Sequence, residues 1–158
     1  MAAQYSDPSI SAMLVERKLL PSDYVARIAL KNKRGHKERE LDVTGAKGNQ
    51  YRLILRENNI NRLDFSIILA LCPPMKSALF RLRRYNGKCH EHTNKLEHLT
   101  FYDFHIHTAT ERYQELGTRE DAFAEVTNRY ADIHGAFSCM LDDCGFEIRA
   151  NPQGTLLF

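Results

Sequence analysis

Several features that would place this chain in a specialised class are missing from its sequence. Its 158 residues include only eight glycines and five prolines, too few for a fibrous or disordered chain when 43% of the residues are hydrophobic. No apolar run approaches the roughly 18–20 residues that a membrane span needs, and the longest is broken by Pro73 and Pro74. The first residues also lack the basic start and the apolar stretch of a secretory signal. We therefore expect a single domain, residues 1–158, with no membrane partner.

Cysteine and glycine motifs are scarce too. The four cysteines form no Cys-x-x-Cys pair, which favours reduced thiols and a cytoplasmic location. Gly35, Gly45 and Gly48 fit turns and do not form a glycine-rich phosphate loop. These absences argue against a disulfide scaffold and against the common nucleotide-binding motifs.

Charge is distributed unevenly along the chain. The formal net charge is +2, but residues 1–110 hold 18 Lys and Arg against 11 Asp and Glu, and residues 111–158 hold 4 against 9. The densest basic stretch is 76–92, which contains five Lys and Arg residues and one acidic residue, Glu91. Such a stripe can neutralise phosphates, which makes RNA a candidate partner, or it can simply solvate an outer strand face.

Histidine is concentrated in one region. Five of the seven histidines fall within the 18 residues 90–107, and four of them form the His-x-His pairs His90/His92 and His105/His107. In an extended segment the period of two places both rings of a pair on one face, roughly 6.5–7 Å apart at the backbone. The two pairs are therefore the strongest indication of a site.

The hydrophobic periodicity predicts an α+β fold. We expect an antiparallel sheet of five to six strands, with a short N-terminal helix at 9–20 and a long C-terminal amphipathic helix at 119–144 packed on one face. Gly145 would end the long helix. A buried helix is the alternative for the apolar residues 63–71. The strands are expected at 24–31, 38–44, 50–57, 63–71, 79–85 and 100–109.

Two alternating segments are expected to build one polar surface. In 79–85 and 100–109 apolar and polar residues alternate, so antiparallel pairing of the two segments would gather the polar side chains on one face. The intervening loop would bring Lys88, His90 and His92 beside them. The residues expected on this surface are Arg81, Arg83, Tyr85, Asp103, His105 and His107.

This set of side chains suggests metal-independent RNA cleavage. Imidazole suits both proton transfers because its reference pKa of about 6.5 is close to neutral pH, and Arg and Lys stabilise charge on a phosphate. The candidate catalytic residues are His90, His92, His105, His107 and Lys88. The candidate substrate-binding residues are Arg81, Arg83, Arg84, Tyr85 and Asn86.

Two other interpretations remain open. The four paired histidines, with Cys89, His98 or Asp103 in reserve, contain enough ligands for a metal ion such as zinc, although the ribonuclease hypothesis needs no cofactor. The basic face could instead dock a nucleic acid or an acidic protein without catalysis, as in a phage- or defence-associated inhibitor.

The run Arg84–His92, with the aromatic strand at Tyr102–Phe104, resembles the central motif of the TumE-like toxins. In that family a strand ends in a turn, and Gly-Lys, a His-x-His pair and an aromatic strand follow. The resemblance covers about residues 76–107 and implies roles for Asn86, Lys88, His90 and His92. It also implies a prokaryotic toxin that acts on RNA and is neutralised by a cognate antitoxin protein.

Overall fold

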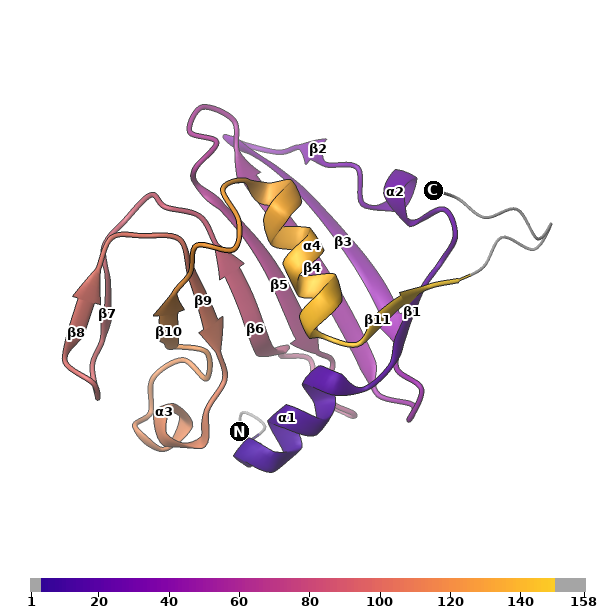
Figure 1. Ribbon diagram of the computed structural model, residues 1–158. Coiled ribbons are helices and arrows are strands. Elements are labelled where there is room, and N and C mark those ends of the chain that lie inside the picture. The colour runs from indigo at the N-terminus through magenta and orange to yellow at the C-terminus, as the bar shows by residue number, and fades with distance from the viewer. Residues whose placement is uncertain (1–3, 150–158) are drawn as a thin grey trace.

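A seven-stranded antiparallel sheet dominates the computed structural model, which describes residues 4–149 (Figure 1). Its strand order is β10-β9-β6-β5-β4-β3-β2, and every neighbouring pair is antiparallel. The strands are β2 (Lys31–Asn32), β3 (His36–Thr44), β4 (Gln50–Asn58), β5 (Phe65–Leu71), β6 (Phe80–Asn86), β9 (His105–Thr108) and β10 (Phe123–Val126). The antiparallel α+β architecture is confirmed.

Two short strand pairs lie outside this sheet. One joins β1 (Lys18–Leu20) to β11 (Phe146–Ile148) in parallel, and the other is the hairpin of β7 (His92–Asn94) and β8 (Leu99–Phe101). The helices are α1 (Asp7–Val15), α2 (Tyr24–Arg27), α3 (Glu111–Glu115) and α4 (Ile133–Asp143). Within residues 4–149, no helix combines the length and the apolar character needed to cross a bilayer.

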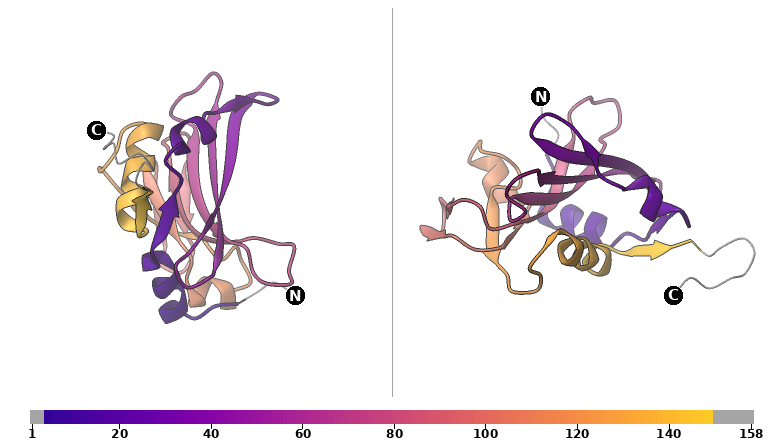
Figure 2. Two further views of the ribbon diagram at one scale, coloured as in Figure 1. Left: turned by 90° about the vertical axis from the view of Figure 1, so that its right-hand side faces the viewer. Right: turned by 90° about the horizontal axis from the view of Figure 1, so that it is seen from above.

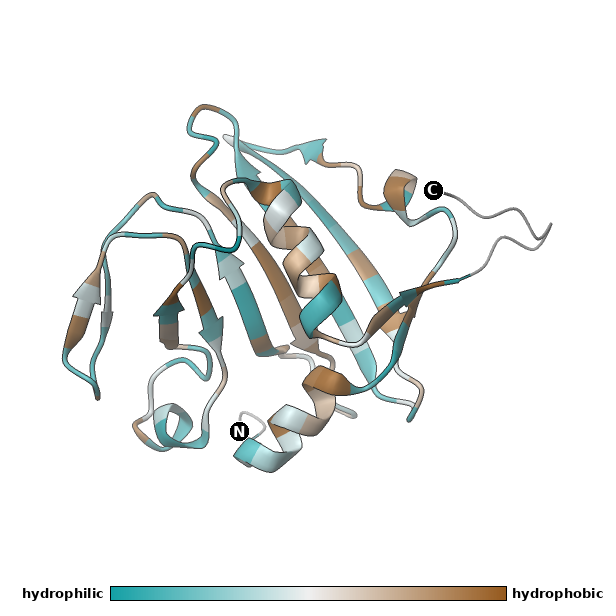
Figure 3. Cartoon of the chain, viewed as in Figure 1, coloured by the Kyte–Doolittle hydropathy of each residue, from teal (hydrophilic) through white to brown (hydrophobic). Residues whose placement is uncertain are grey.

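Helices of the described chain cover the central strands of the large sheet on one face only. Figure 2 shows α4 and the β1–β11 pair on that side. On the opposite face, called the uncovered face below, the β7–β8 hairpin packs over β9 at one end of the sheet. The strand β4 alternates accordingly, with Tyr51, Leu53 and Leu55 buried toward α4 and the residues between them more exposed. In Figure 3 the central strand β5 is hydrophobic along most of its length, as expected for the middle of the core.

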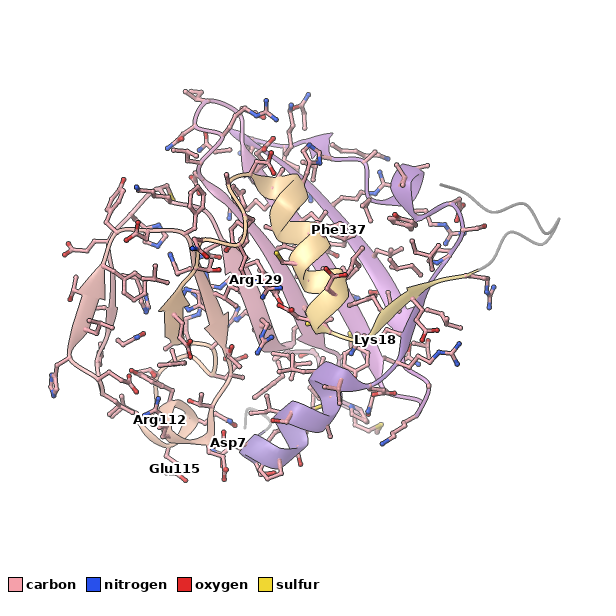
Figure 4. All side chains as sticks on the ribbon, viewed as in Figure 1. Asp7, Lys18, Arg112, Glu115, Arg129 and Phe137 are labelled. Atoms are coloured by element: carbon pink, nitrogen blue, oxygen red, sulfur yellow. The ribbon has the colours of Figure 1, made fainter. Side chains whose placement is uncertain are left out.

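A short N-terminal helix is confirmed, but it covers Asp7–Val15 and not 9–20, because Lys18–Leu20 form β1. Its ends have clear local causes. The Ser6 side chain accepts a hydrogen bond from the Ser9 amide, and a proline lies in the first turn. At the other end the buried Lys18 ammonium donates to the carbonyl oxygens of Met13, Leu14 and Glu16, at 2.7, 3.1 and 2.8 Å. The same ammonium donates to the oxygen of Cys144 at 2.8 Å, so one side chain (labelled in Figure 4) joins the C-terminal ends of α1 and α4.

The long C-terminal helix was predicted wrongly. Residues 123–126 form the edge strand β10, and α4 is an 11-residue helix that begins after Asp132, whose side chain accepts from the Gly135 amide at 2.8 Å. The spacing of Phe123 and Val126 also fits a helix, but their backbone pairs with the edge of β9, which would otherwise be free. Gly145, with a φ of 72°, does end the helix as expected.

Three other expectations on strands fail. The strand expected at 100–109 is interrupted at residues 102–104, because β8 pairs with β7 and only β9 joins the large sheet. Residues 24–31 were expected to form a strand, but they contain the single-turn helix α2 and only the first residue of the short strand β2. The sheet has seven strands and exceeds the expected five to six because β2 and β10 extend it at both edges.

Candidate metal centre

A β-bulge in β6 decides which side chains reach the uncovered face. Leu69 pairs with Arg83 and Ala70 pairs with Arg81, so Leu82 is the extra residue of β6. The bulge shifts the in–out alternation of β6 by one residue. Leu82 and Tyr85, although three positions apart, are therefore both buried toward α4. Arg81 and Arg84 consequently lie on the opposite, uncovered face.

Arg83 and Tyr85 therefore do not lie beside the histidines, contrary to expectation. The Tyr85 hydroxyl donates to Asp143 Oδ2 of α4 at 2.7 Å, and Arg83 Nη1 lies 4.0 Å from the same atom. Arg129, labelled in Figure 4, completes this cluster with two 2.8 Å hydrogen bonds to Asp143. These residues connect α4 to the sheet and do not contribute to the histidine face.

The strand register brings the rest of the predicted surface together. Across the β6–β9 pair, Arg84 is opposite His107 and Asn86 is opposite His105, and directly opposed residues share a face. His105 and His107 are both buried, at 0% and 3% exposure. The expected polar surface exists here, with Arg84 and Asn86 in the places predicted for Arg83 and Tyr85.

Four histidine rings converge at this point. The ring centroids of His92 and His107 are 4.8 Å apart, and those of His105 and His107 are 4.9 Å apart. His92 stacks on His105 at 5.4 Å, and His90 meets the edge of His105 at 5.8 Å. The sequence prediction that the two His-x-His pairs come together is borne out by these contacts.

A buried asparagine positions the hairpin that carries His92. Asn94 donates through Nδ2 to the Ala124 oxygen at 2.7 Å and accepts through Oδ1 from the Ala124 amide at 2.9 Å. These two bonds attach β7 to β10. Because Oδ1 is thereby an acceptor, the 2.8 Å contact from His92 Nε2 requires an N–H on that nitrogen. The Nδ1 of His92 is left with a free lone pair.

The other two rings are also held by an oxygen, here through Nδ1, and Nε2 of His105 accepts a 3.4 Å contact from Asn86 Nδ2. Nδ1 of His105 donates to the Asp103 oxygen at 2.7 Å, and Nδ1 of His107 donates to the Asp121 oxygen at 2.7 Å. Each donation fixes the tautomer and leaves Nε2 unprotonated, which is the state that binds a metal ion. One candidate ligand atom from each of His92, His105 and His107 lies within 4.8 Å of the others.

Burial keeps the two inner rings neutral. Loss of solvation, with the Arg84 guanidinium as the next cause, lowers the pKa of His107 to about 2. Loss of solvation also lowers the pKa of His105 to about 4, against a hydrogen bond to Asp103 that raises it. Neither ring is an imidazolium at neutral pH, and a neutral imidazole is a metal ligand.

Asp121 supplies the negative charge that the sequence did not indicate for this site. Its carboxylate, fully buried, lies 3.1 Å from Arg84 Nε, 3.7 Å from Arg81 Nε and 3.6 Å from Arg119 Nε. The same residue holds His107 through its backbone oxygen. The guanidiniums beside the rings are therefore partly compensated, which lowers the repulsion that a divalent cation would meet.

The remaining predicted residues lie around the cluster. Lys88 Nζ is 3.8 Å from the Asp103 carboxylate at the surface, and Cys89 Sγ is 3.1 Å from His90 Nδ1. His98 is exposed in the turn of the β7–β8 hairpin and is not in the ring cluster. No carboxylate or thiol joins the group formed by the three ligand atoms in the described chain.

The three histidines fit a zinc ion with small adjustments. Zinc–nitrogen bonds of about 2.0–2.1 Å in a tetrahedron place nitrogens about 3.3 Å apart, so the rings would move inward on binding. Three protein nitrogens leave one coordination position for solvent.

The chain matches no protein-family model, no curated protein and no solved structure. The evidence for a function is therefore the geometry of this centre.

Proposed function

We propose that this protein binds a zinc ion through His92, His105 and His107 and uses the fourth coordination position to activate a water molecule for hydrolysis. One observation carries the proposal. All three rings have an N–H held by an oxygen, and their candidate ligand atoms lie within 4.8 Å of one another. Such outer hydrogen bonds are typical of metal-binding histidines.

The chemistry of the donors favours zinc over other common ions. Three imidazoles suit zinc and neighbouring transition metals, whereas magnesium and calcium prefer oxygen ligands. Structural zinc sites have four protein ligands, and hydrolytic sites have three plus water. A site with three histidines matches the second kind.

The test is the zinc content of the purified protein after equilibration with zinc and removal of the excess. We expect one zinc per chain in the wild type and at least a 100-fold weaker affinity in His92→Gln and in His107→Gln. His92 is only half-buried, so its variant is expected to fold even if His107→Gln does not. The matched control is His98→Asn, because Asn tolerates the φ of 55° found at that position.

Absence of zinc from the folded wild type would overturn the proposal. Unchanged zinc affinity in folded His92→Gln would overturn it too. Circular dichroism of each variant establishes whether the fold is retained.

The metal-independent ribonuclease, with RNA and a cognate antitoxin as partners, stays a prediction. Since His105 and His107 are buried and neutral, a protonated general acid would have to be His90 or His92, the two rings of the cluster with some exposure. Activity on RNA in EDTA separates the two hypotheses, because a zinc-dependent site loses activity there and an acid–base site does not.

A further inference from the structure

A small cavity lies beside the histidine cluster on the uncovered face of the sheet. Its volume is about 200 Å³, and its lining includes Arg56, Ser66, Arg84, Asn86 and His90. The strand pairings place Arg56 opposite Glu38 on one side and Ser66 on the other, and Ser66 opposite Asn86. The cavity therefore continues the polar row that ends at His105.

Asn86 lies between the cavity and the proposed zinc site. Its side chain is 5% exposed, and its Nδ2 is 3.4 Å from Nε2 of His105. Its Oδ1 is buried without a hydrogen-bond partner among residues 4–149. Buried acceptors are nearly always paired, so this oxygen is available to accept from a bound molecule. A water on zinc at the fourth position is such a donor.

Positive charge dominates the lining. Arg84 reaches the cavity while its Nε is 3.1 Å from Asp121, and Arg56 is exposed and forms no ion pair within residues 4–149. Glu38, the cross-strand neighbour of Arg56, pairs with Lys33 at 3.1 Å. The one carboxylate in the lining, Asp64, is close to Asn58 Nδ2 at 3.3 Å.

We propose that this cavity holds the phosphoryl group of a phosphoester and that the ester is the substrate of the zinc site. The inference rests on the proposed function. Arginine guanidiniums bind the tetrahedral oxyanion through paired hydrogen bonds, and the Ser66 hydroxyl is a further donor. The volume fits a phosphoryl group with a small part of its alcohol.

The reaction is hydrolysis of the ester. The oxygen of the activated water forms a bond to phosphorus, and the bond between phosphorus and the alcohol oxygen breaks. The proton released by the water ends on the alcohol oxygen. The products are one phosphate, or phosphate monoester, and one alcohol, with no other reactant.

The test uses zinc-loaded protein and titrates it calorimetrically with inorganic phosphate. We expect Arg56→Gln to weaken phosphate binding at least tenfold and to slow cleavage of bis(p-nitrophenyl) phosphate by a similar factor, with one zinc still bound. The matched control is Arg52→Gln on the same strand and face, because Arg52 Nε is held by Asp42 at 2.7 Å and is not in the lining. Its phosphate affinity should stay within twofold of the wild type.

Phosphate binding that is unchanged in Arg56→Gln, or that acetate displaces equally well, would overturn the phosphoryl assignment. Zinc-loaded protein that binds no phosphate would also overturn it while leaving the zinc proposal intact. A wild type that binds no zinc would overturn the proposed function itself, so the two failures are distinguishable.

Discussion

Asp121 contacts His107 and Arg84 through different atoms. Its backbone oxygen accepts the Nδ1 proton of His107 at 2.7 Å, and its buried carboxylate lies 3.1 Å from Arg84 Nε. The tautomer of a candidate ligand and the compensation of the nearest positive charge thus depend on one residue. Arg84 is also the cross-strand neighbour of His107, so Asp121, His107 and Arg84 are each adjacent to the other two.

Asp121→Asn should therefore affect both metal affinity and stability. Without the carboxylate, Arg84 remains a nearly buried charge beside the rings, and loss of one partner of a buried ion pair costs about 3 kcal/mol of unfolding free energy. Zinc affinity should fall about tenfold because the site becomes more positive. Calorimetric zinc titration and urea unfolding measure the two effects. Arg119→Gln, at the exposed edge of the same cluster, should change stability by less than about 1 kcal/mol.

The stability of the zinc-free protein should fall in mild acid. In the unfolded chain His105 and His107 protonate near pH 6.5, but in the folded chain their pKa values are about 4 and about 2. As the pH falls below 6.5 the unfolded state takes up protons that the folded state does not, so the free energy of unfolding decreases. The expected loss at pH 5 is about 2 kcal/mol per histidine relative to pH 7.5.

Urea unfolding of zinc-free protein at pH 7.5 and pH 5 measures this loss. The free energy of unfolding should differ between the two pH values by about 2 kcal/mol less in His107→Gln than in the wild type. In the exposed-site variant His98→Asn this difference should be unchanged. Equal pH dependence in wild type and His107→Gln would contradict the prediction.

Asn94→Ala should release the β7–β8 hairpin from β10. The variant loses both bonds to Ala124 and the acceptor of His92 Nε2, at a cost of about 2 kcal/mol for the groups left unpaired. Amide exchange in residues 92–101 should become faster, and zinc affinity should fall about tenfold because His92 loses its orientation. Lys95→Ala, at the exposed position that follows, is the control and should change neither.

Lys18→Met should be strongly destabilising although the side chain is remote from the site. Burial lowers the pKa of Lys18 to about 8, which still leaves the ammonium protonated at pH 7. Methionine fills similar space but leaves four carbonyl oxygens at the ends of α1 and α4 without their donor, and we expect a loss of about 3 kcal/mol or more. Thermal unfolding provides the measurement, with exposed Lys47→Met as the control.

The sequence predicted the convergence of the histidines because that part depends on a local rule. A period of two places His105 and His107 on one face whichever strand lies next to them. The bulge at Leu82 follows no such rule, since Arg83 and Arg84 are adjacent in sequence and either can face the rings. One extra residue in β6 exchanged their positions.

The supporting residues were missed for a different reason. Asp121 lies in the first turn of the helix expected at 119–144, and Asn94 lies in the loop expected between 79–85 and 100–109. Asp121 accepts from His107 through its backbone oxygen, and Asn94 bonds to the backbone of Ala124. In both cases the two partners are distant in the sequence. Residue-type patterns do not encode such pairings, which arise only once β10 has joined the sheet.

The parallel pairing of β1 with β11 joins segments from the two ends of the described chain. Lys18 obtains its bond to Cys144 only when the C-terminal end of α4 is present. During synthesis on the ribosome, α1 and β1 therefore emerge long before their partners exist. The N-terminal segment must wait until residues 144–148 have been synthesised, so we expect the described residues to fold as one unit and not progressively as they emerge.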